Sequence, residues 1–237
     1  MAKGFLDVAL GVGLAVAIAL VGLLPKSLVA QECRSEPAPG INWGGCGKRN
    51  LMLSGSDFTN ASLAEADLSF TDLRDSIFKG ADLEKAKLAR AWLAGVQAEK
   101  ANFSKIEGYR ADFQKMQAKG ATFAGAELQR ANFSGADLEG VSFEKAELSR
   151  VNFDKATLTK SRFSYTNLAR ADFTDAIFDG PLDFSSSFLF LTKIQGVDLS
   201  KATGLDQHQI NMACGDAKTK LPPGLSAPYS WPCGDTD

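Results

Sequence analysis

The stretch "AELQRANFSGADLEGVSFEKAELSRVNF", residues 126–153, repeats at two periods at once. A small residue, a polar residue and a Leu or Phe recur every five positions, and an Arg recurs after twenty, at Arg130 and Arg150. An α-helix cannot keep a five-residue stripe on one face, because five steps turn it by about 500°. A straight strand fails as well, because an odd step reverses the face. The pattern therefore predicts a chain that turns a corner every five residues.

The five-residue period extends far beyond this stretch. Of the 26 positions that lie five apart from Leu53 to Phe178, 23 are Leu or Phe, and the residue two before is Ala at 15 of them. We call this Leu or Phe position the centre of the repeat. At each of the three exceptions the centre is a small residue, and a larger residue lies two positions before it: Val96 with Ala98, Ile106 with Gly108, and Met116 with Ala118. This exchange conserves the interior volume, as a close-packed core demands.

Four corners complete a coil of twenty residues, and such coils would stack at the β-sheet spacing of about 4.8 Å. The pattern A-(D/N)-(L/F)-x-x, as in "ADLEK", "ANFSG" and "ADFTD", resembles the pentapeptide-repeat proteins over about residues 50–205. The resemblance implies an all-β solenoid, a right-handed quadrilateral β-helix, with caps at its ends. Phe centres recur every ten residues from Phe103 to Phe173, which predicts Phe on two opposing walls and Leu on the others. Such a core is full, so we expect no cofactor and no internal substrate cavity.

The first thirty residues form a separate segment. An uncharged apolar run of 17 residues extends from Val8 to Leu24 and is followed by Pro25 and "KSLVA". It predicts a signal peptide over 1–30 that is cleaved after Ala30, or else a retained N-terminal membrane anchor. The first alternative makes the protein periplasmic or secreted. The second leaves it membrane-anchored with the β-helix outside the cytoplasm.

The rest of the chain divides into an N-terminal cap (31–50), the repeat solenoid (51–205) and a C-terminal cap (206–237). All four cysteines lie outside the repeats. Three pairings are possible, but a long solenoid separates its two ends, which favours Cys33–Cys46 and Cys214–Cys233. Their spacings do not match a C-x-x-C metal or redox motif. Disulfides agree with export.

The C-terminal cap carries a helix signal. Asp206 and Gln209 have capping-box spacing, which predicts a short helix that closes the core. His208 is the only histidine and is interpreted as a surface residue of this cap. Trp43 and Trp231 are interpreted as aromatic residues of the two caps.

The repeat register breaks once near the C-terminal end. The centre after Phe178 is Phe184, six residues later, and "DGPLD" lies between them. We interpret this as a one-residue bulge at a bent corner. Phe188 and Phe190 then flank a centre and are expected to point outwards, where something should cover them.

The twenty-residue period predicts a column of five arginines about 19 Å long. It comprises Arg90, Arg110, Arg130, Arg150 and Arg170, bordered by Trp92 and Tyr109. One interpretation is a surface ladder that neighbouring acids neutralise: Glu107, Glu127, Glu147, Asp112 and Asp172. The other is a stripe that binds carboxylate or phosphate groups, which stacked guanidinium forks suit.

The favoured function is a non-enzymatic, exported structural or protein-interaction scaffold in the bacterial envelope, with an unknown envelope protein as partner. The alternative is binding of an anionic glycan, a lipid or an acidic protein along the arginine column.

A carbohydrate-active enzyme is less favoured, because no pair of acidic residues departs from the repeat pattern. Some members of the family that the chain resembles mimic DNA and protect DNA gyrase. That role fits poorly, because residues 51–205 hold 21 acidic and 19 basic residues, so no nucleic-acid role is expected. Contact with a membrane is expected only if the N-terminal segment is retained.

Overall fold

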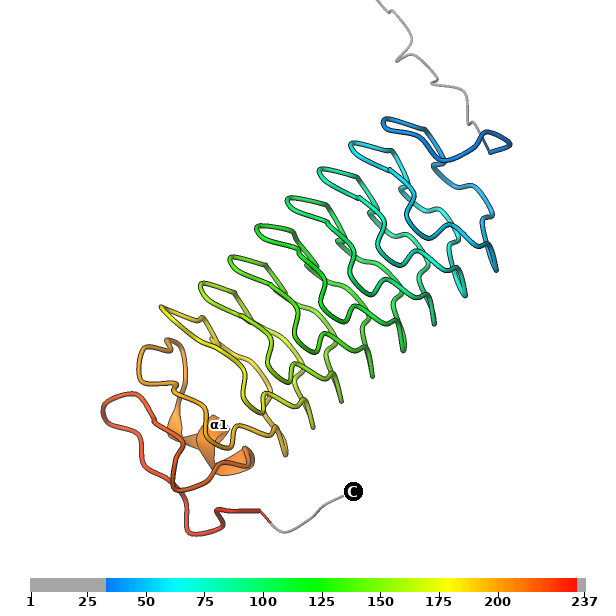
Figure 1. Cartoon of the computed structure of the whole chain (residues 1–237). Helices are drawn as coiled ribbons and strands as arrows, with labels where there is room; N and C mark the ends of the chain where they lie inside the picture. Colours follow the sequence, from blue (N-terminus) through cyan, green and yellow to red (C-terminus); the bar gives the residue numbers. More distant parts are fainter. Residues whose placement is uncertain (1–32, 234–237) are drawn as a thin grey trace, which may run out of the picture.

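The computed structural model describes residues 33–233. The predicted signal peptide or anchor at 1–30 lies outside these residues. The chain winds as a stack of similar coils along one axis, with the N-terminal coils at one end and a small helix at the other (Figure 1). The only helix in the described residues is α1, Gln207–Met212, and the same residues contain no extended strand. None of them forms a helix long and apolar enough to cross a membrane.

Successive coils are joined by single-residue parallel bridges. The first described bridge joins Asn42 to Ser62, and the residues bridged are twenty apart as far as Thr157 and Ile177. Each coil forms backbone hydrogen bonds with the coils on both sides of it. The Glu127 N–H donates to the Ile106 carbonyl of the preceding coil, and the Leu128 N–H donates to the Glu147 carbonyl of the following coil. Because each coil bonds to the coil before it and the coil after it, its backbone polar groups are satisfied without long strands.

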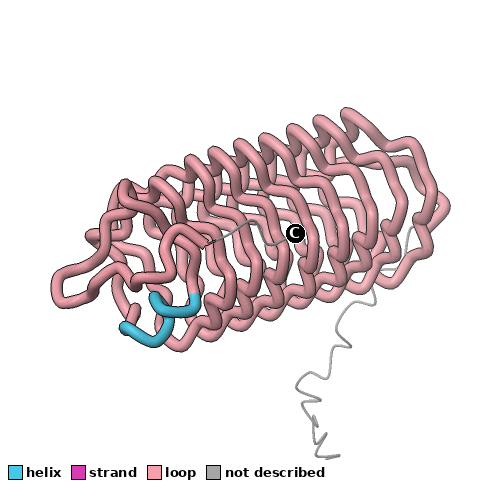
Figure 2. The backbone as a smooth tube through the Cα atoms, turned by 90° about the horizontal axis from the view of Figure 1, so that it is seen from below, coloured by secondary structure: helices cyan, strands magenta, loops and turns pink. Residues whose placement is uncertain are grey.

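Each corner is a two-residue turn, closed by a hydrogen bond such as that from the Ala131 N–H to the Leu128 carbonyl, 2.9 Å. The second turn residue has a positive φ in coil after coil, for example 62° at Arg130 and 65° at Gly125. Viewed at right angles, the corners line up into straight edges along the solenoid (Figure 2). A residue at one corner therefore lies next to residues twenty positions earlier and later.

The interior is filled as the sequence predicts. The Leu and Phe centres and the small residues before them are almost all buried. Phe103 and Phe123 stack at 4.7 Å between ring centroids in one column, and Phe113 and Phe133 stack at 4.6 Å in a second. The two columns meet edge to face, as between Phe123 and Phe133 at 5.4 Å. The predicted pair of Phe walls is confirmed.

The compensated repeats are also confirmed. Val96, Ile106 and Met116 are completely buried. A methyl group added at Gly108 would lie 2.8 Å from Leu128 Cδ2 and 3.5 Å from Ile106 Cδ1. The larger residue therefore occupies the space that a centre side chain takes elsewhere.

The break in register occurs where the sequence places it. Beyond it Arg162 bridges Asp183, a separation of 21 residues, while Phe163 still stacks on Phe184 at 5.3 Å. The extra residue is absorbed outside the core, so the Phe column continues through it.

Both ends are closed by covalent and polar contacts. The two expected disulfides, Cys33–Cys46 and Cys214–Cys233, are present. At the N-terminal end Trp43 is 1% exposed and packs against Phe58.

At the C-terminal end α1 starts with the predicted capping box, in which Asp206 and Gln209 bond each other's backbone N–H. The Gln209 side-chain amide also donates to the carbonyls of Phe184 and Ser187, which ties α1 to the last coils. His208 is exposed on α1.

Candidate functional site

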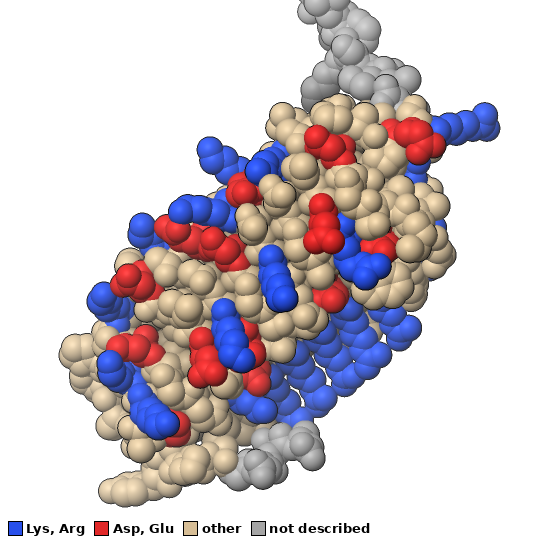
Figure 3. Space-filling model, in the orientation of Figure 1, with Lys and Arg blue, Asp and Glu red and all other residues tan. Residues whose placement is uncertain are grey.

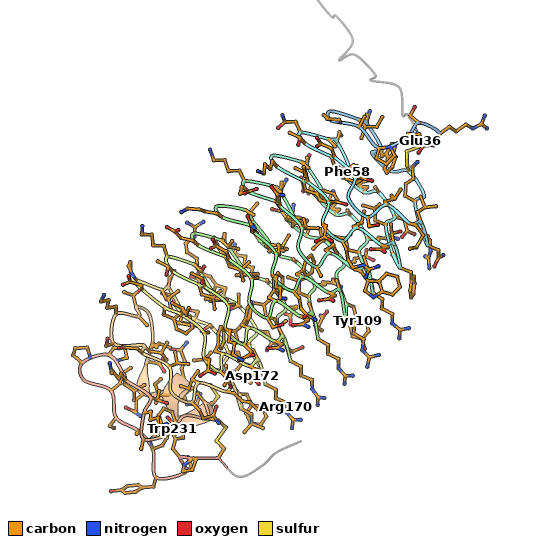
Figure 4. All side chains as sticks on the ribbon, viewed as in Figure 1. Glu36, Phe58, Tyr109, Arg170, Asp172 and Trp231 are labelled. Atoms are coloured by element: carbon orange, nitrogen blue, oxygen red, sulfur yellow. A yellow bond between two sulfur atoms is a disulfide. The ribbon has the colours of Figure 1, made fainter. Side chains whose placement is uncertain are left out.

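One edge of the solenoid carries the predicted arginine column. Each arginine is the second residue of the same corner in five successive coils, with φ between 54° and 62°. Figure 3 shows a row of Lys and Arg side chains along one edge, and Figure 4 places Tyr109 and Arg170 on that edge. We call this set the Arg row: Arg90, Arg110, Arg130, Arg150 and Arg170.

The backbone does not favour arginine at these positions. A side chain in the left-handed region costs about 1 kcal/mol relative to glycine. Glycine takes the equivalent position repeatedly on the diagonally opposite corner, at Gly80, Gly120 and Gly140. On the Arg-row corner no residue at this position from Asn50 to Arg170 is glycine. The guanidinium groups are therefore present in spite of the local conformation.

The acidic neighbours of the Arg row form no direct ion pair with it in the described residues. Within residues 33–233 no Arg-row guanidinium lies within 4.0 Å of a carboxylate. Asp112 accepts the Gln114 N–H at 3.1 Å instead, and Asp172 accepts the Thr174 N–H and lies 3.8 Å from Lys193.

The reason is the geometry of the solenoid. Nine of the twelve ion pairs in the described residues join partners 18 to 22 positions apart, such as Lys105 and Glu84 at 3.0 Å. A corner residue thus pairs mainly with the coil before or after it. For the inner members of the Arg row the neighbour in both directions is another arginine.

A row of carboxylates runs beside the Arg row. Its members lie on the wall that leads into this corner, three residues before an arginine in the same coil, and parallel bridges join them in line. All three are exposed, and the one side-chain bond in the described residues is from the Asn167 amide to Glu147, 2.9 Å. We call this set the Glu row: Glu107, Glu127 and Glu147. Together the two rows form a mixed-charge edge.

Aromatic residues lie at the N-terminal end of this edge. The Arg90 guanidinium lies 5.8 Å from the Phe70 ring centroid, and Arg110 lies 5.3 Å from the Tyr109 ring. Tyr109 is 39% exposed and Trp92 is 47% exposed on the next wall. The structure therefore brings both aromatic residues of the predicted stripe to the surface near the arginines.

The C-terminal end of the edge is apolar. Phe188 bridges Asn167 and so continues the line of the Glu row, and the Phe190 carbonyl accepts the Arg170 N–H. The two rings stack on each other at 6.1 Å and remain 46% and 44% exposed. They point outwards as expected, but no described residue covers them as expected. Sequence reasoning missed their link to the edge, because the inserted residue shifts them out of the twenty-residue count.

No group of three or more His, Cys, Asp or Glu in residues 33–233 is placed to hold a metal ion. A surface notch of ≈ 430 Å³ forms where Ala124 and Gly125 lack long side chains. In this notch the hydrogen bond and the charge of Lys105 hold the pKa of Glu84 below its ordinary value. A carboxyl in that state does not store a proton near neutral pH for general acid catalysis.

A closed, four-cornered stack of five-residue units with its chemistry on the outside defines a repeat protein. Two family models for pentapeptide repeats match residues 49–80 and 109–144 in one case and 143–187 in the other. The chain belongs to the pentapeptide-repeat family.

Solved structures with this repeat are similar to the chain. HetL, a pentapeptide repeat protein involved in heterocyst differentiation regulation from the cyanobacterium Nostoc, is 24% identical over 84% of this chain and 92% of its own, with a TM-score of 0.37. A trypsin-treated form of QnrB1, a plasmid-mediated fluoroquinolone resistance protein, is 18% identical over 77% and 91%, with a TM-score of 0.48. A pentapeptide repeat protein from the Arabidopsis thaliana thylakoid lumen is 21% identical over 71% and 80%, with a TM-score of 0.24. These likenesses carry no conclusion about function. No curated protein matches the chain significantly.

Proposed function

We propose that this chain is an exported, non-enzymatic scaffold of the bacterial envelope that binds a protein partner through its mixed-charge edge. The observation that carries the proposal is the Arg row, a line of five guanidinium groups with no ion pair in the described residues. Five like charges about 4.8 Å apart repel one another. A partner that supplies carboxylates relieves this repulsion, so the row favours complex formation.

Location outside the cytoplasm is supported by the cysteines. The two disulfides pin the two ends of the solenoid and leave no free thiol in residues 33–233. Such bonds persist in oxidising compartments. The apolar segment at 1–30 supplies a route of export, and its cleavage or retention decides between a periplasmic and an anchored protein.

The absence of enzymatic activity is supported by packing. Pentapeptide-repeat proteins are generally non-enzymatic. The Leu and Phe centres from Phe58 to Phe173 are at most 1% exposed. Their side chains fill the interior, which therefore offers no room for a substrate.

An anionic glycan or lipid is the second candidate, because the Arg row suits any line of negative charge. The Glu row, three residues from the arginines, repels a uniformly anionic polymer. A protein surface that presents both signs of charge fits the edge better.

The test is partner capture from a cell-envelope extract. The bait is the protein expressed with residues 1–30, so that export and processing take place, and a second bait carries Gln at all five Arg-row positions. A matched control removes five positive charges from other corners: Lys85, Lys105, Lys115, Lys145 and Lys155 to Gln. We expect a protein that the first and control baits retain and the Arg-row variant loses. Equal retention by all three baits would refute the proposal, and salt-sensitive retention of an anionic polymer alone would favour the second candidate.

A further inference from the structure

We propose that the partner of the mixed-charge edge is the same edge of a second copy of this chain, related by a two-fold axis parallel to the solenoid. The inference rests on the proposed function only in taking this edge as a contact surface. It adds the identity of one partner and the symmetry of the complex.

The first argument is spacing. The Arg row repeats once per coil, at about 4.8 Å. Carboxylates on one face of an extended peptide repeat every second residue, at about 6.8 Å, and fall out of step within a few arginines. A second copy has no such mismatch, because its Glu row is built on the same coils, with Glu107, Glu127 and Glu147 joined by parallel bridges.

The second argument is symmetry. A two-fold axis parallel to the solenoid and between the rows leaves the height along the solenoid unchanged and exchanges the two rows. Arg130 of one copy then faces Glu127 of the other, and the reverse contact forms as well. Arg110 faces Glu107, and Arg150 faces Glu147, in the same way. A two-fold axis perpendicular to the solenoid would place arginine opposite arginine, so the charges select the parallel arrangement.

The third argument is the exposed phenylalanine pair. Phe188 continues the Glu row and Phe190 lies on the Arg-row corner, with both rings nearly half exposed. Phe190 takes the turn position that Gln129 takes in its own coil, so the same rotation brings the two Phe190 rings together at the axis, with one Phe188 on each side. Four rings would then share one apolar contact, which gives the pair the cover that the single chain lacks.

The arrangement contains one unfavourable contact. Lys87 occupies the Glu-row position in the coil of Arg90 and is exposed. In the pair it faces Arg90 of the second copy, so like charges meet at this end. The contact strip is also narrow, so the association is weak and sensitive to salt.

This contact provides a gain-of-function test. Lys87→Glu extends the Glu row by one coil and replaces two repulsive contacts per pair with two attractive ones. We expect the dissociation constant of the self-association, measured by sedimentation equilibrium at low ionic strength, to fall by about tenfold. Lys115→Glu is the matched control, because it makes the same charge change on another corner and should leave the constant unchanged. Equal effects of the two substitutions, or no self-association of either protein, would overturn the proposal.

Charge reversal in mixed samples tests the pairing of the rows. One variant carries Glu at Arg110, Arg130 and Arg150, and the other carries Arg at Glu107, Glu127 and Glu147. Both replacements have precedents in the solenoid, since Glu65 occupies a turn position with φ 61° and Arg162 occupies a bridge position. Unchanged thermal unfolding of each variant confirms that both are folded.

Each reversed variant alone should remain monomeric, because its two rows carry the same sign. The equimolar mixture should form a one-to-one complex tighter than the parent pair, and salt should dissociate it. A mixture that stays monomeric would overturn the proposal. That result leaves the proposed function intact if the Arg-row variant still loses an envelope protein in the capture experiment, so the two ideas fail separately.

Discussion

The exchange of volume between Ile106 and Gly108 makes a quantitative prediction about the core. Ile106→Ala deletes three buried carbon groups, worth about 0.8 kcal/mol each, and leaves a cavity, so we expect a loss of about 3–4 kcal/mol in the free energy of unfolding. Gly108→Leu places a side chain where a Cβ already lies 2.8 Å from Leu128 Cδ2. Overpacking of this kind costs about 1–3 kcal/mol.

The double variant should recover most of the loss. It recreates the Ala–Leu pair of the coils directly before and after, Ala86 with Leu88 and Ala126 with Leu128. We expect its free energy of unfolding to lie within about 1 kcal/mol of the parent, with a coupling energy of at least about 2 kcal/mol. Urea denaturation followed by tryptophan fluorescence measures all four proteins. Additive losses in the double variant would refute the idea that volume is shared between the two positions.

Two further predictions concern the caps and the carboxylates. Replacing Cys214 and Cys233 by Ser removes a disulfide between residues 19 apart. In the chain-entropy account this should lower the free energy of unfolding, measured by chemical denaturation, by about 3 kcal/mol. An unchanged free energy of unfolding would show that the cap holds without the disulfide. Hydrogen bonds from the Arg74 side chain hold the pKa of Asp72 below its ordinary value, and the Gly196 N–H does the same for Asp216. A lowered folded-state pKa stabilises the protein above the unfolded value of about 3.9, so this stability should be lost as the pH falls below about 4. Unfolding curves over a pH series, with Asp72→Asn as comparison, should show a smaller acid loss in the variant, and stability that rises on acidification would contradict the assignment.

The core was predictable because its code is local and periodic. In each five-residue unit the position in the repeat identifies the residue that points into the core. The Phe columns and the volume exchange at Gly108 therefore follow from spacing alone. The break before Phe184 was visible for the same reason, since the next centre arrives six residues later instead of five. The capping box at Asp206 is likewise a signal contained in four residues.

The pairing of surface charges was not predictable from proximity in the sequence. Glu127 lies three positions from Arg130, which suggested an ion pair, yet the nearest partners of a corner residue lie one coil away. The role of Phe188 and Phe190 was hidden for a related reason. One inserted residue moves them off the twenty-residue count, and only the bridge from Asn167 shows which row they continue.

The pairing of two mixed-charge edges is tested most directly by a single cysteine between the rows. Gln129 lies between Glu127 and Arg130 in the sequence, so a two-fold axis between the rows brings it close to Gln129 of the second copy. All four native cysteines are in disulfides, so Gln129→Cys adds one free thiol, and Gln117→Cys provides an exposed control on another wall. Mild oxidation at low ionic strength should cross-link the first variant into a covalent dimer and leave the control monomeric, with high salt suppressing the reaction. Equal cross-linking of the two variants, or none in either, would contradict the account.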